Sequence, residues 1–135
     1  METPSTASLS TRLGVKNGSS LILLHAPTSL EWEIDPSVNV KRTRRGNADV
    51  VVAFYTTTSL LTGEIEALGR LIFPSGSLWL AWPKRSSGVP TDLSDHVLRC
   101  VTLPLGLVDN KVCAIDATWT ALRLVWRLER RATSI

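Results

Sequence analysis

Residues 48–55, ADVVVAFY, restrict the possible folds of this chain more than any other segment. The run is apolar at both even and odd positions, so a strand here presents apolar side chains to both faces of its sheet. Strands of this kind are typical of parallel sheets that other parts of the chain cover on both sides. The segment therefore predicts a buried parallel strand in an α/β fold.

Three further segments have the length and composition of strands. They are the apolar residues 19–27, which stop at Pro27, the more exposed and alternating residues 38–44, and residues 77–83. Pro83 lacks an amide hydrogen and is expected to end the last of these strands.

Two segments between or after these strands show helical spacing. Residues 59–73 carry one apolar stripe, with most of the charged side chains off it. The stripe consists of Leu61, Ile65, Leu68 and Ile72. A second helix, capped by Thr91 or Asp92, repeats apolar side chains every four residues until Pro104.

The last third of the chain returns to strands. Residues 111–115 and 122–128 are rich in β-forming side chains, and the connection between them is too short for a helical crossover. They are expected to pair antiparallel, with Trp119 in the connection, either exposed or folded back over the sheet. Strand, helix, strand and helix followed by a hairpin predict a three-layer α/β sandwich with a Rossmann-like mixed sheet.

The length of 135 residues fits a single domain. We expect residues 13–128 to form it, between a flexible tail at 1–12, rich in Ser and Thr, and a frayed end at 129–135. With 44% hydrophobic residues, the chain can bury a proper core.

Charge and composition narrow the classes of function. The net charge of +3 favours an anionic ligand only weakly. The sequence has no basic patch interleaved with aromatic residues, so nucleic-acid binding is not favoured. Two cysteines without CxxC spacing predict small buried side chains in a reducing cytoplasm, and with only two histidines we expect no metal site. No apolar run reaches the roughly 20 residues of a membrane helix, and no signal peptide is expected.

Residues 48–84 resemble the later half of class I S-adenosylmethionine-dependent methyltransferases. In that family a strand and a helix lead through a pro-x-gly turn to the next strand, and the sheet ends in an antiparallel hairpin. The segments LWLAWPKRSSGVPTDL and LPLGLVDNKVCAIDATWTALRLVWR resemble a bacterial family of small proteins of unknown function, characterised by WPKxxSG and LVDNKVCAID motifs. The resemblance covers roughly residues 12–128 and implies a methyltransferase-like fold without an established activity.

Two features of the methyltransferase family are missing. The family places a glycine-rich turn after its first strand and a carboxylate at the end of its second strand, where they hold the cofactor. Here the first strand runs into HAPTSLEW, and the second ends in cations at Lys41, Arg42, Arg44 and Arg45. We therefore expect no S-adenosylmethionine cofactor and no methyl transfer.

Ligands of open α/β sheets bind beyond the carboxyl ends of the parallel strands, which here bring together residues 25–29, 55–59 and 84–92. We expect a non-enzymatic protein, without catalytic residues, that binds an anionic small molecule or a protein partner. The candidate ligand-binding residues are Lys84, Arg85, Ser87 and Asp92, with Asp109 and Lys111 beside them if the sheet order follows the resembling fold.

Each of these polar residues also has a purely structural interpretation. Lys84 can simply solvate a strand end, Thr56 to Ser59 can cap a helix, and His25 can be a structural hydrogen-bonding group. Asp109 can form a turn, and Lys111 can guard a strand edge. Two functional alternatives also remain open: a small enzyme using Lys84 or an Asp–Lys pair, and a weak nucleic-acid binder. The latter would use Arg42, Arg44, Arg45, Arg127, Arg130 and Arg131.

Overall fold

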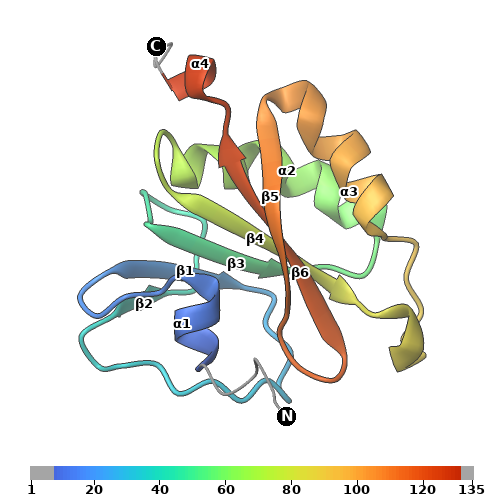
Figure 1. Cartoon of the computed structure of the whole chain (residues 1–135), viewed down its shortest axis with the longest axis horizontal. Coiled ribbons are helices and arrows are strands. Elements are labelled where there is room, and N and C mark those ends of the chain that lie inside the picture. Colours follow the sequence, from blue (N-terminus) through green and yellow to red (C-terminus); the bar gives the residue numbers. More distant parts are fainter. Residues whose placement is uncertain (1–7, 132–135) are drawn as a thin grey trace.

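The computed structural model describes residues 8–131. The elements in chain order are α1 (Leu9–Leu13), β1 (Ser20–Leu24), β2 (Asn39–Lys41), β3 (Val50–Phe54), α2 (Thr58–Ile72), β4 (Ser77–Pro83), η2 (Arg85–Ser87), α3 (Asp95–Thr102), η3 (Leu103–Leu105), β5 (Leu107–Ala114), β6 (Trp119–Trp126) and α4 (Leu128–Arg131). Figure 1 shows the strands as one twisted sheet with helices on both sides.

The sheet has six strands in the order β2-β1-β3-β4-β6-β5. The first four strands are parallel, while β6 runs antiparallel to both β4 and β5. Every residue of β3 is buried, as its doubly apolar sequence predicts. The mixed Rossmann-like sheet and its closing antiparallel hairpin are therefore confirmed.

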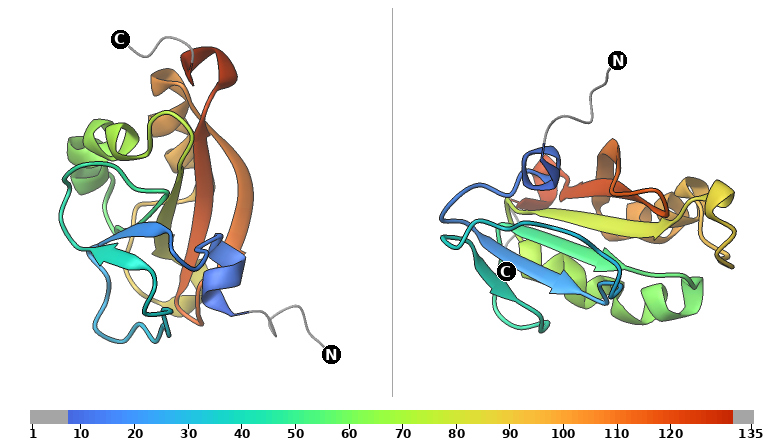
Figure 2. Two further views of the ribbon diagram at one scale, coloured as in Figure 1. Left: turned by 90° about the vertical axis from the view of Figure 1, so that its left-hand side faces the viewer. Right: turned by 90° about the horizontal axis from the view of Figure 1, so that it is seen from below.

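The two faces of the sheet are covered differently. Helices α2 and α3 pack on one face, where the predicted stripe of α2 is buried. The opposite face is covered by α1 and by the irregular chain between β1 and β2, including Trp32 and Ile34. Figure 2 shows α1 and α2 on opposite sides of the sheet. The third layer of the sandwich is thus made mostly of non-helical chain.

Trp119 is the first residue of β6 rather than part of the connection. Its ring lies edge to face with Phe54, with centroids 5.2 Å apart. Of the two placements considered for this side chain, the structure has the one that folds back over the sheet.

Several boundaries differ from the sequence prediction. Residues 9–12, expected in the tail, form most of α1, because the Ser8 side chain caps the helix and Leu13 is buried against the sheet. The second predicted helix begins at Asp95, because Ser94 rather than Thr91 or Asp92 caps it. Strand β2 is shorter than predicted, since residues 42–47 are exposed.

The ends of the chain and the cysteines complete the comparison. Residues 129–131 lie in α4, whereas residues 1–7 and 132–135, which belong to the predicted flexible ends, lie outside the described residues. Both cysteines are unpaired, but Cys100 is exposed on α3 and Cys113 is half-buried, so the prediction that both are buried is wrong. Among residues 8–131, no helix has the length and apolar character needed to span a bilayer.

Candidate functional site

The carboxyl ends of the parallel strands lie at one edge of the sheet, which we call the carboxyl edge. His25 follows β1, Tyr55 follows β3, and Lys84 follows β4. The segments that sequence reasoning expected to converge are therefore brought to the same edge, where open α/β sheets bind their ligands.

A hydrogen-bonded cluster of His25, Tyr55 and Glu64 occupies part of this edge. Nε2 of His25 lies 2.9 Å from Oε1 of Glu64, and the Tyr55 hydroxyl donates to the same oxygen at 2.6 Å. The rings of His25 and Tyr55 meet edge to face, with centroids 5.3 Å apart. The cluster therefore joins the end of β1, the end of β3 and helix α2.

Burial and neighbouring charges set the protonation of this cluster. Burial alone raises the pKa of Glu64, but hydrogen bonds from Tyr55 and His25, with the positive charges of His25 and Arg44, hold that pKa below its ordinary value. Burial, together with the hydrogen bond to Glu64, raises the pKa of Tyr55 far above its ordinary value. Glu64 is therefore a carboxylate at neutral pH, and Tyr55 is a neutral hydrogen-bond donor.

The backbone of His25 is itself unusual. Its φ of 58° lies in the left-handed region, which residues other than glycine adopt rarely. The side chain is 42% exposed, so the imidazole is fixed by Glu64 on one side and meets solvent on the other. Sequence reasoning treated His25 as a structural hydrogen-bonding group but did not find Glu64, because 39 residues separate the two.

A cleft of about 470 Å³ lies beside the loop that follows β4. Of the predicted ligand-binding residues Arg85 lines the cleft, whereas Ser87 donates to the Lys84 carbonyl and accepts from the Val89 amide. Asp92 accepts hydrogen bonds from the amide and hydroxyl of Thr58, at 2.7 and 3.1 Å. Ser87 and Asp92 thus hold the loop and the start of α2 in place.

Asp109 and Lys111 lie on opposite faces of the sheet. The pairing of β5 with β6 shifts between these two residues, so Asn110 interrupts their regular alternation. Asp109 faces α3 and pairs with Arg99, with an Nε–Oδ2 distance of 3.1 Å. Lys111 lies opposite Arg123, at the level of Trp79.

This placement separates Lys111 from the residues after β4. Trp79 precedes Lys84 by five residues, or about 16 Å of strand. The structure therefore does not bring Lys111 beside Lys84, and it forms no Asp109–Lys111 pair. Of the two versions of the enzyme alternative, the one that uses an Asp–Lys pair is therefore not assembled from Asp109 and Lys111.

The two arginine groups of the nucleic-acid alternative lie at opposite edges of the sheet. Arg42, Arg44 and Arg45 follow β2 at the carboxyl edge. Strand β6 runs the other way, so Arg127, Arg130 and Arg131 lie at the edge where β2 begins. The two groups do not form one continuous basic surface.

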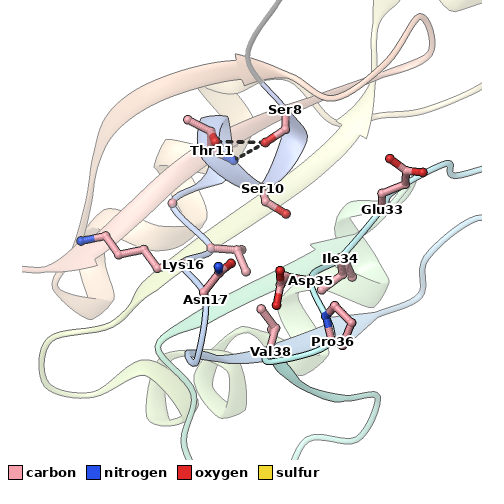
Figure 3. A pocket seen from close by; sticks show the side chains of 12 residues that line it. Ser8, Ser10, Thr11, Lys16, Asn17, Glu33, Ile34, Asp35, Pro36 and Val38 are labelled. Atoms are coloured by element: carbon pink, nitrogen blue, oxygen red, sulfur yellow. Dashed lines mark hydrogen bonds between the residues drawn. The ribbon is translucent and has the colours of Figure 1, made fainter.

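A cleft of about 900 Å³ lies near the amino ends of β1 and β2. It separates α1 and the following turn from residues 33–38, and Figure 3 shows Lys16 pointing away from the acidic side chains. Ser37 lowers the pKa of Asp35, first through its side chain and then through its amide, which donates to Asp35 within the same turn. The acidic side chain of Asp35 thus stabilises a turn.

Among residues 8–131, no group of three or more His, Cys, Asp or Glu residues is arranged to hold a metal ion.

No protein-family profile and no curated protein sequence matches the chain. Solved structures do match. A methyltransferase from Aquifex aeolicus that depends on S-adenosylmethionine (SAM) superposes with a TM-score of 0.59 at 12% identity, over 84% of this chain and 85% of that one. A TehB-like SAM-dependent methyltransferase from Corynebacterium glutamicum gives 0.58 at 8% identity, over 92% and 90%. The chain has a methyltransferase-like fold.

Fibrillarin from Aeropyrum pernix, solved with natively bound SAM, shares this methyltransferase-like fold with a TM-score of 0.56 at 12% identity, over 87% of this chain and 73% of that one. The superpositions establish the architecture. At identities this low they do not show the chemistry, which depends on the residues at the carboxyl edge. In this chain those residues include the His25, Tyr55 and Glu64 cluster and the cations after β2.

Proposed function

We propose that this protein is a non-enzymatic binding protein with a methyltransferase-like fold, which holds an anionic small molecule and does not transfer methyl groups. The observation that carries the proposal is the His25, Tyr55 and Glu64 cluster at the carboxyl edge. The resembling family keeps a glycine-rich turn after its first strand. Here a histidine follows β1, and its ring packs over the ends of β1 and β3.

The charge of the same edge supports the proposal. Four cations stand within the five positions that begin at Lys41, where the resembling family has the carboxylate that holds the ribose. Residues 42–45 are exposed, and the charge of Arg44 reaches Glu64 and Tyr55. Such an edge repels the sulfonium of SAM and attracts an anion.

The proposed anion site lies after β4. Lys84 and Arg85 both follow the strand end, Lys84 half-buried and Arg85 on the wall of the cleft. A guanidinium and an ammonium at one strand end can share a phosphate or carboxylate group. Ser87 and Asp92 would contribute by holding the loop and not by touching the ligand. The free cysteines suit a cytoplasmic location.

A thermal-shift titration tests the anion site. Inorganic pyrophosphate is expected to raise the melting temperature of the wild-type protein, because a ligand that binds only the folded state stabilises it. The Lys84→Gln/Arg85→Gln double variant is expected to show a smaller shift, and the matched control Arg127→Gln, which removes an exposed cation at the other edge, is expected to keep the wild-type shift. An equal shift in all three proteins would contradict the proposed site.

A further inference from the structure

A second cleft, of about 380 Å³, lies between α1 and the β5–β6 hairpin. Its walls carry three cationic side chains from three elements: Arg12 of α1, Lys111 of β5 and Arg123 of β6. The remaining lining residues are Thr11, Leu13, Gly14, Trp79 and Asn110, so none of the described lining residues is acidic. We call this the hairpin cleft.

Two of the cations face each other directly. Lys111 and Arg123 are cross-strand partners in the register of β5 with β6. Like charges at opposed positions destabilise a sheet, so this pair reduces the stability of the ligand-free protein. Asn110 accepts a hydrogen bond from Nη1 of Arg123 at 3.1 Å, which orients the guanidinium. An anion placed between the two cations would remove the repulsion.

Arg12 brings a third cation to the wall of the same cleft. Its Nη1 donates to the Ala114 carbonyl, which holds the side chain across the end of β5. Its Nε is buried and has no hydrogen-bond partner among the described residues.

The floor of the hairpin cleft is rigid. Trp79 is fully buried in β4, and its Nε1 donates to the Leu13 carbonyl at 2.9 Å. This bond fixes α1, and Arg12 with it, relative to the sheet. Arg12 and Arg123 are therefore held in place before a ligand arrives, which lowers the entropic cost of binding.

We propose that the hairpin cleft binds the phosphate group of a phosphorylated small molecule. A phosphate monoester carries close to two negative charges at neutral pH and offers several acceptor oxygens, which match two planar guanidinium groups and one ammonium. The cleft is larger than one phosphate group requires, so an organic part can accompany it. This site lies mid-strand on the α1 face, independent of the proposed site after β4.

The test uses ribose 5-phosphate as the probe and ribose as its uncharged comparison, with binding measured by calorimetry. Lys111→Gln and Arg123→Gln are each expected to weaken ribose 5-phosphate binding at least about tenfold, the loss expected of one charged hydrogen bond. Arg12 is left unchanged, because its guanidinium also anchors α1. Arg127→Gln, which removes an exposed cation outside both proposed sites, is expected to bind as the wild-type protein does, and Lys84→Gln/Arg85→Gln reports whether the site after β4 takes the probe instead.

The ligand-free melting temperature gives a second readout. Lys111→Gln is expected to leave it unchanged or raise it, because the substitution removes a like-charge pair; a lowered temperature would show a structural role and overturn the proposal. Equal affinity in all variants, equal binding of ribose, or loss only in Lys84→Gln/Arg85→Gln would also overturn it. Tighter binding of an RNA duplex through the same cations would replace the small molecule with a nucleic acid.

Discussion

Glu64 Oε1 lies 2.9 Å from Nε2 of His25 and accepts, at the same oxygen, the hydroxyl of Tyr55. One carboxylate oxygen therefore ties helix α2 to the ends of two parallel strands. It does so at the edge where proteins of this architecture bind their ligands.

Glu64→Gln is expected to reduce the free energy of unfolding by about 1 to 3 kcal/mol at neutral pH, because a half-buried charged hydrogen-bond acceptor is replaced by a neutral one. The pKa of Glu64 is held below its ordinary value in the folded state. Its contribution is therefore complete above the unfolded pKa and lost as the pH falls through the lower folded pKa. Urea unfolding of both proteins across this range should show their difference shrinking at acid pH. A difference independent of pH would contradict the assigned ionisation.

Gly69→Ala is expected to destabilise the protein by about 1 to 3 kcal/mol, because overpacking outweighs the gain in helix propensity. The added Cβ would lie 2.9 Å from the Trp126 ring, whose Nε1 donates to the Gly69 carbonyl. Gly63→Ala, on the same helix, meets no atom within 4 Å and should stabilise by up to about 1 kcal/mol. Thermal unfolding of both variants measures the contrast. Two stabilised variants would show that Trp126 moves aside freely.

Asp92→Ala is expected to cost about 0.5 to 2 kcal/mol of stability, as for the loss of a capping hydrogen bond, because the first amide of α2 loses its side-chain acceptor while the N-cap Thr57 remains. Its Oδ1 accepts from the Thr58 amide at the first residue of α2. Pyrophosphate binding should change little, because Asp92 holds the helix and does not face the anion. Chemical denaturation and the pyrophosphate titration of this variant give the two readouts. Unchanged stability with lost binding would make Asp92 a ligand contact.

The sheet was predictable because its signal is local. The doubly apolar residues 50–54 predict a strand covered on both faces, and the short connection before β6 predicts an antiparallel pair of strands. Both predictions are confirmed. The covering of the second face was less predictable, since Trp32 and Ile34 pack there from irregular chain that has no periodicity.

The contacts of the candidate site were not predictable, because they depend on positions far apart or on a single inserted residue. Glu64 lies on the polar side of a helical stripe, and nothing local links it to His25. Asp109 and Lys111 are two residues apart, which in a regular strand puts them on one face. The irregularity at Asn110 reverses this, and no residue type marks it in advance.

Calorimetric titration of the purified protein with SAM tests the central claim most directly. Since His25, Tyr55 and Glu64 occupy the carboxyl edge and cations surround it, we predict no saturable binding up to millimolar SAM. Saturable micromolar binding that His25→Ala or Glu64→Gln weakens would contradict the account.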